Sequence, residues 1–414
     1  MPNVLPTPAF IADKMLEFLF EGSGVVNDVY RKLEAEFTMD KQSIGRAIQV
    51  KDPPRVQSQA GPVINTAQSI NHGLTTFSID KWRTVLVKVT GLEKTFNNAK
   101  ELDIWAEENL KPYVSPLVTD IETDIGQLYK KIPNVVGTPG TGPTTYDPMG
   151  AAKERLTLYR TPQDSRVCYL HPSGSRKLGT GLVSVFNPQG PLGNQFTSGK
   201  VVPEIAGFAT REGNFLPMHT NGSVTTTGAN VLTNGANQVG STIAVDAFTT
   251  GTTYEEGDVI TFADVYGVDP VSGQSTGQLR EFVIRADVTA AGNAANLSIS
   301  PAVVPSGAFK NITGATADLT GIPDGKAVTL KTGTVSTAYS QNMAWWKNAI
   351  GLVTVPILPL EGVKSSVQKT YKGIHLTFSM DGDIMNFETI KRIDLAYGVN
   401  IFDKYIDQAV RITN

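Results

Sequence analysis

The chain has one cysteine, Cys168, among its 414 residues, so no disulfide can form within it. Charged residues are also scarce: they make up 18% of the sequence, whereas a typical soluble domain has about 25%. No apolar run approaches the roughly 18 residues that a membrane-spanning helix needs. These shortages predict a chain that folds in a reducing compartment, has no membrane anchor and buries much of its surface against other chains.

A basic excess is missing as well. The formal net charge is −3 and the isoelectric point is near 5.9. Dedicated nucleic-acid binders usually carry an excess of Lys and Arg on one face, because affinity grows with each neutralised phosphate. The composition therefore excludes a dedicated nucleic-acid binder, and we expect any contact with nucleic acid to be weak and local.

The side chains that usually carry chemistry do not form a site in the sequence. Cys168 lies in the middle of an apolar strand pattern, where a cysteine is usually a small buried hydrophobe. The glycine-rich stretch Gly137–Thr145 lacks the Lys of a phosphate-binding loop, and its two prolines remove backbone N–H donors that such a loop uses. The histidines show no pair at helical metal-ligand spacing, since they are scattered at His72, His171, His219 and His375. We predict no catalytic, cofactor or metal site, and no enzymatic activity.

The longest helical pattern lies between Ala99 and Ile132. Its apolar residues recur at spacings of three and four, which places one face of a helix at Leu110, Val114, Leu117, Val118, Ile121, Ile125, Leu128 and Ile132. Pro112 and Pro116 oppose this helix, because a proline in a helix interior costs about 3 kcal/mol. Ser115 before Pro116 also resembles an N-cap and first helical position. We therefore predict a break, or a separate leading helix, near residue 112.

The region before this helix changes its period. Residues 1–36 have apolar residues at helical spacing, with Thr7 and Pro8 as the helix start, and they predict a short amphipathic arm. Residues 37–90 contain two stretches with strand-like alternation, separated by a long polar segment that we expect to project as a hairpin.

Four basic residues are spread over this hairpin region, at Lys51, Arg55, Lys81 and Arg83. A spread of this kind is compatible with two interpretations. The residues either form a solvated face or make salt bridges to a neighbouring subunit.

The remainder alternates between two compositions. The order helix, strand and loop after residue 137 predicts an α/β layer, with a helix at Ala151–Tyr159 and a buried strand at Arg166–Leu170. Residues 221–344 are rich in Thr, Gly, Ala and Ser, and contain five basic against ten acidic residues. Their short, evenly spaced strand patterns predict a small β-barrel or sandwich. Because the α/β pattern resumes after residue 344, this segment is expected to be an inserted domain.

Three motifs resemble one protein family, in its order and spacing. They are VVPEIAGFATREGN at Val201–Asn214, GDVITFADVYGVDPVSGQSTGQLREFVI at Gly257–Ile284, and RIDLAYGVN at Arg392–Asn400. Together they resemble the major capsid proteins of tailed bacteriophages of the Salmonella podovirus coat type. The residues that match the family motifs are Gly207, Phe208, Arg392, Asp394, Tyr397 and Gly398.

This resemblance implies an α+β fold of the Hong Kong phage capsid type with an inserted all-β barrel domain. The implied parts are an N-terminal arm at 1–36, an extended loop at 37–90, a P-domain with a spine helix at 91–150, an A-domain beginning at 151–220, an insertion domain at 221–344 and a return through the A- and P-domains at 345–414.

The resemblance also implies a function. Copies of the chain would assemble as hexamers and pentamers into an icosahedral virion shell in the host bacterial cytoplasm. The implied partners are a separate scaffolding protein, a portal protein and packaged double-stranded DNA held by weak local contacts. Two alternatives remain open from the residues alone: a β-domain binding module such as a virion decoration protein or adhesin, and an enzyme of the α/β class.

Overall fold

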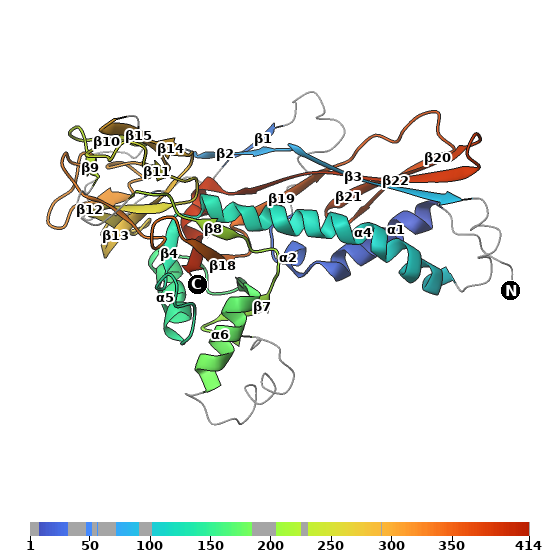
Figure 1. The fold of residues 1–414 in the computed structure, drawn as a ribbon, viewed down its shortest axis with the longest axis horizontal. Coiled ribbons are helices and arrows are strands. Elements are labelled where there is room, and N and C mark those ends of the chain that lie inside the picture. Colours follow the sequence, from blue (N-terminus) through green and yellow to red (C-terminus); the bar gives the residue numbers. More distant parts are fainter. Residues whose placement is uncertain are drawn as a thin grey trace, which may run out of the picture. The chain divides into compact units, whose positions relative to one another are not determined.

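The computed structural model describes residues 8–31, 47–51, 56, 72–90, 102–183, 204–224, 231–290 and 292–413. The chain is α+β, as predicted (Figure 1). It divides into two compact units. The first unit contains Met1–Val50, Thr76–Ile125 and Ile350–Asn400; the second contains Lys51–Thr75, Gly126–Ala349 and Ile401–Asn414.

The first unit is built on a five-stranded sheet. Its strand order is β19, β22, β21, β20, and β3 also pairs with β22. The strands are β3 (Lys81–Thr90), β19 (Ile350–Val355), β20 (Ser365–Tyr371), β21 (Ile374–Asp383) and β22 (Glu388–Ile401). The predicted alternation is confirmed in β3, where Trp82, Leu86 and every second residue between them are exposed and their neighbours are partly covered.

The N-terminal arm forms α1 (Pro8–Gly22) and the short α2 (Gly24–Asn27). The predicted helical start at Pro8 is confirmed, while Thr7 lies outside the described residues. The apolar face of α1 packs on β20 and β21 of the same unit, and the Phe20 ring meets the Tyr371 ring edge-on at a centroid distance of 5.3 Å. The amphipathic arm therefore covers its own sheet.

The long helix is continuous, so the predicted break near residue 112 is wrong. Helix α4 runs from Leu102 to Gly126 through both prolines and passes into the 3-10 helix η3 (Gln127–Lys131) (Figure 1). Pro112 and Pro116 are one turn apart on the exposed side of the helix. Each proline leaves one backbone carbonyl without its helical N–H donor, and on this side water can bond to that carbonyl instead. The opposite face is fully packed, at Leu110, Val114, Leu117, Val118, Ile121 and Ile125. Burial of this face overrides the proline signal, and Ser115 is a helix interior residue rather than an N-cap.

The second unit contains a seven-stranded mixed sheet. Its strand order is β4, β23, β18, β5, β7, β6, with β8 paired to β18. The strands are β4 (Asn134–Val136), β5 (Arg166–Leu170), β6 (Glu204–Ile205), β7 (Phe208–Glu212), β8 (Met218–Thr220), β18 (Ala338–Trp346) and β23 (Ala409–Thr413). Helix α5 (Asp147–Leu158) contacts β23 and β4, and the 3-10 helix η4 (Asp403–Gln408) leads into β23. Helix α6 (Pro172–Val183) was not predicted, although Pro172 at its first position is a helix-start signal.

The strands between residues 231 and 330 form a second seven-stranded sheet of the same unit. Its order is β16, β12, β13, β15, β10, β9, with β17 paired to β12. The strands are β9 (Leu232–Thr233), β10 (Gly240–Asp246), β12 (Val259–Val268), β13 (Ser275–Ile284), β15 (Ala294–Val303), β16 (Ile312–Thr313) and β17 (Val328–Leu330). Beside it, β11 (Thr253–Tyr254) pairs with β14 (Val288–Thr289).

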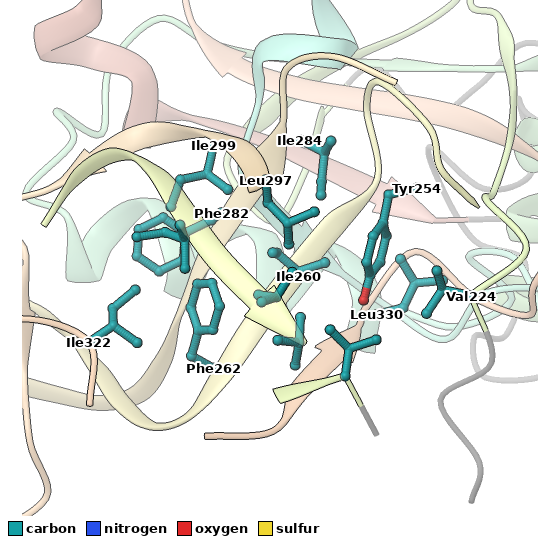
Figure 2. Packing of buried hydrophobic residues seen from close by; sticks show 14 of the residues in the cluster. Val224, Tyr254, Ile260, Phe262, Phe282, Ile284, Leu297, Ile299, Ile322 and Leu330 are labelled. Atoms are coloured by element: carbon teal, nitrogen blue, oxygen red, sulfur yellow. The ribbon is translucent and has the colours of Figure 1, made fainter. Parts of the chain in front are cut away.

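These strands enclose their own apolar core. Figure 2 shows Phe262, Phe282, Ile260 and Leu297 pointing toward one another from β12, β13 and β15. The Phe262 and Phe282 rings meet edge-on at a centroid distance of 5.5 Å. The core is therefore supplied by residues that alternate along each strand, as the strand patterns of this segment predict.

The predicted projecting hairpin falls largely outside the described residues. Strands β1 (Ala47–Lys51) and β2 (Leu74–Ser78) pair with each other and begin and end it, while residues 52–55 and 57–71 lie outside the described part. No helix within the described residues is long and apolar enough to cross a membrane.

Candidate functional site

The residues of the C-terminal motif meet the predicted basic residues along the pairing of β3 with β22. In this antiparallel ladder Lys81 lies opposite Tyr397 and Thr84 lies opposite Asp394. Since successive side chains of a strand point to opposite faces, Arg392 and Asp394 share one face of the sheet and Tyr397 lies on the other. The motif therefore supplies two clusters, one on each side of the same pair of strands.

The inner cluster fastens helix α4 to the sheet. The Tyr397 hydroxyl donates to Asp124 Oδ2 at 2.6 Å, and Lys81 Nζ donates to Asp124 Oδ1 at 2.8 Å. Arg83 adds two longer ion pairs, to Asp124 at 3.7 Å and to Asp120 at 3.4 Å. Burial, together with the hydrogen bond to the Asp124 carboxylate, raises the pKa of Tyr397, so the phenol remains a hydrogen-bond donor at neutral pH.

The basic residues of the predicted hairpin have different outcomes. Lys81 and Arg83 make salt bridges within their own chain, an arrangement that neither sequence interpretation included. Lys51 ends strand β1, and Arg55 lies outside the described residues. A role for these four residues in contacts between subunits stays a prediction.

The outer cluster surrounds one buried carboxylate. Asp394 is 3% exposed and accepts hydrogen bonds from Arg392 Nε at 2.7 Å, Arg392 Nη2 at 2.9 Å, Thr84 Oγ1 at 2.6 Å and Trp82 Nε1 at 3.0 Å. Burial opposes ionisation of Asp394, but the hydrogen bonds from these three residues outweigh it and hold the pKa of the carboxyl below its usual range. The ring of Trp82 is fixed in place by this bond while 56% of the residue stays exposed.

The motif glycines have separate roles. A Cβ on Gly398 would lie 2.2 Å from the carbonyl oxygen of Ser78, so only glycine lets the end of β2 approach β22 this closely. Gly207, in the second unit, has φ +78 and follows Ala206 at φ +52 in the two-residue turn between β6 and β7. Positive φ at both positions is typical of a type I′ hairpin turn, for which glycine is favoured. Phe208, the next residue, is fully buried in the core around β5 and β7.

The chemistry of the two clusters is that of attachment. Their acids and bases are paired with each other, and the Cys168 thiol is buried in the second unit, which raises its pKa. Within the described residues no group of three or more His, Cys, Asp or Glu side chains is arranged to hold a metal ion. We conclude that the residues of the C-terminal motif fix the geometry of the first unit.

The sequence did not identify three partners of these clusters: Asp124, Thr84 and Trp82. Asp124 is separated from Tyr397 by 273 positions, so no spacing rule connects them. Thr84 and Trp82 lie in the second of the two strand-like stretches predicted within residues 37–90, and in β3 they alternate with Lys81 and Arg83.

We expect Tyr397→Phe to lower the free energy of unfolding of the first unit by about 1–2 kcal/mol, because a buried hydrogen bond to a charged group is lost while the ring is kept. Thermal unfolding followed by calorimetry measures this loss. The matched control is Tyr371→Phe on β20, where the residue is 44% exposed. Equal melting temperatures for wild type and Tyr397→Phe would show that the Asp124 bond contributes nothing to stability.

Comparisons with known proteins give one extensive match. A family model described as "P22 coat protein - gene protein 5" matches residues 34–405. No curated protein sequence matches the chain significantly.

Among solved structures, one from Mycobacterium phage Che8 is 11% identical, with 94% of this chain and 89% of that chain covered and a TM-score of 0.45. The capsid structure of the cyanophage P-SCSP1u is 12% identical, with 89% and 83% covered and a TM-score of 0.42. The I-domain of the CUS-3 coat protein is 18% identical, with 25% of this chain and 97% of that chain covered and a TM-score of 0.18. At these values the structural likenesses add nothing to the family match.

Proposed function

We propose, from the premise that the chain belongs to the P22 coat protein family, that its copies assemble as hexamers and pentamers into an icosahedral shell around a double-stranded DNA genome. Family membership makes the chain a major capsid protein of a bacteriophage virion, a structural protein rather than an enzyme. Because the match extends over residues 34–405, it leaves the binding-module and enzyme interpretations without support.

The hydrogen bonds that join the long elements of the first unit support this proposal. A shell subunit must present the same contact surfaces in every copy, so its long elements need a fixed relation to each other. The inner cluster fixes α4 to the sheet and the outer cluster fixes β3 to β22, through carboxylates that are 9% exposed at the Asp124 side chain and 3% exposed at Asp394.

An exposed apolar hairpin tip is the observation that favours contact with other copies most directly. Ile384, Met385 and Phe387, between β21 and β22, are 94%, 93% and 73% exposed. Asp383 holds the tip in shape, since its carboxylate accepts from the Met385 N–H at 2.9 Å and from the Asn386 side chain at 2.7 Å. A grouped, preorganised set of large apolar side chains in water is typical of a protein contact surface.

The proposal includes the partners and parts that family membership suggests. A separate scaffolding protein directs assembly in the host cytoplasm, and a portal protein occupies one vertex. The packaged DNA makes weak local contacts, in keeping with the net charge of −3. The division at residues 36, 90, 150, 220 and 344 is part of the same proposal, as are subunit contacts through the extended loop.

The test is assembly with the scaffolding protein of the same phage, followed by electron microscopy and sedimentation. We expect the wild type to give closed shells. The double variant Ile384→Ser/Phe387→Asn should lower the shell yield at least tenfold without lowering the melting temperature, because these side chains are already exposed in the subunit.

The matched control is Val271→Ser, which changes an apolar residue that is 57% exposed in the second unit. Only soluble monomers from the wild type under all assembly conditions would contradict the proposed function. Normal shell yield from the tip variant would instead place the tip outside the subunit contacts.

A further inference from the structure

A buried guanidinium lies in the second unit without a hydrogen-bond partner. Arg411 on β23 is 0% exposed, and none of its three side-chain nitrogens is hydrogen-bonded within the described part of the chain. Its guanidinium carbon lies 5.6 Å from the centre of the Tyr129 ring. Burying a charge is costly unless other charges or dipoles compensate it, so the surroundings of Arg411 need to supply that compensation.

The first compensating group comes from residues 221–344, which we call the insert; the rest of the second unit is its host. Glu281 on β13 of the insert is 3% exposed. Its carboxylate accepts from the Val135 N–H at 2.8 Å and from Arg155 Nη2 at 3.1 Å. Val135 on β4 is the ladder partner of Arg411, so Glu281 is bound directly beside the position of Arg411 in the sheet.

The second group is Asp258, also from the insert and 0% exposed. It accepts from His219 Nε2 at 2.9 Å and from the Gly222 N–H at 3.1 Å. His219 Nδ1 lies 3.2 Å from the hydroxyl of Tyr129, the same ring that lies against Arg411.

Arg411 and Asp258 lie outside the ion pairs that arginine and lysine make between insert and host. Within the described residues these pairs are Arg155 with Glu281 at 3.1 Å, Arg280 with Asp407 at 2.7 Å, Lys130 with Glu256 at 3.0 Å and Arg160 with Asp269 at 2.7 Å. Asp258 and Arg411 are both 0% exposed and take no part in them. Burial lowers the pKa of Arg411 to about 10, which leaves it charged at neutral pH, and burial raises the pKa of Glu281 despite its partner Arg155.

We propose that Arg411 is an electrostatic latch that holds the insert on its host by compensating the buried charges of Asp258 and Glu281. The latch acts through the low-dielectric interior, where charges interact over longer distances than a hydrogen bond spans. One apolar cluster of the junction consists of Val135, Val259 and Val283. Detaching the insert would leave the Arg411 charge on the host without the carboxylates of Asp258 and Glu281, so insert and host unfold together.

The test uses the full chain and a double-mutant cycle read by calorimetry and by protease release of the insert. Arg411→Met should lower the melting temperature of the second unit by about 5 °C or more and should release the insert at lower temperature than in the wild type. In an Asp258→Asn background, the drop in melting temperature caused by Arg411→Met should be at most half of the drop in the wild-type background.

The matched control is an Asp246→Asn background, which removes a half-buried carboxylate on β10 and should leave the loss unchanged. Arg411→Lys keeps the charge and should retain more stability than Arg411→Met, even if the Met variant does not fold. The latch would be overturned if Arg411→Lys and Arg411→Met lowered the melting temperature equally. It would also be overturned if the Asp258→Asn and Asp246→Asn backgrounds reduced the effect of Arg411→Met by the same amount.

Discussion

Gly398→Ala is expected to lower the melting temperature of the first unit by about 5–10 °C, because the new methyl group has no space. Its Cβ would lie 2.2 Å from the Ser78 carbonyl oxygen, and that neighbour is backbone rather than a flexible side chain. Overpacking of this kind costs about 1–3 kcal/mol, since β2 must move away from β22. Asn400 Nδ2 also bonds to the Thr76 carbonyl at 3.0 Å, so the same movement strains a second contact.

The control lies on the neighbouring strand of the same sheet. A Cβ on Gly382, near the end of β21, would meet nothing within 4 Å. Gly382→Ala should therefore leave the melting temperature within about 1 °C of the wild type. Differential scanning calorimetry of both variants decides the point, and a Gly398→Ala protein as stable as Gly382→Ala would show that β2 does not require this approach.

Asp407→Ala is expected to destabilise the second unit by about 3 kcal/mol, because it leaves a buried arginine without its partner. Arg280 is 1% exposed, and its Nη2 lies 2.7 Å from Asp407 Oδ1. The guanidinium otherwise contacts the face of Tyr159, at 5.2 Å from the ring centre. Burial opposes the charge of Arg280, and its interactions with Asp407 and Tyr159 compensate that burial and raise its pKa. Without Asp407 most of this compensation is lost, while an arginine side chain still keeps its proton at neutral pH, so the cost of the buried charge remains.

Urea unfolding of a second variant distinguishes the cost of an unpaired charge from the cost of lost side-chain packing. Arg280→Met/Asp407→Leu removes both charges and should lose less than Asp407→Ala alone, since no charge is stranded. Lys326→Ala breaks the outer pair with Asp264, whose side chain is 62% exposed, and should cost less than about 1 kcal/mol. If Asp407→Ala and Lys326→Ala cost the same, the burial of Arg280 does not make its pair stronger.

The sequence predicts the elements of this protein better than the contacts between them. The two-residue period of β3 and the apolar face of α4 are visible because each depends on neighbours along the chain. The prolines of α4 misled the prediction because tertiary burial, which no local pattern reports, outweighs their cost. Helix α6 was missed because its sequence, PSGSRKLGTGLV, is rich in Gly and Ser, which have low helix propensity, and contains few apolar residues.

The candidate site shows the same division. Arg392 and Asp394 were found as a motif, and their spacing of two predicts a shared face of a strand. The partner of Tyr397 was not predictable, because Asp124 becomes its neighbour only when β22 meets α4. Gly398 is similar: the backbone of Ser78, which requires a glycine there, is brought to it by the fold.

The docking of α1 on β20 and β21 has a consequence for synthesis on the ribosome. Helix α1 is made first, yet the strands that cover its apolar face begin at Ser365. At about 5–20 residues per second, a growing chain carries that face uncovered for tens of seconds. A chain that is still growing, or that ends before these strands, therefore exposes an apolar helix face to chaperones and to other nascent chains, and the first unit closes only after β20 and β21 have been made.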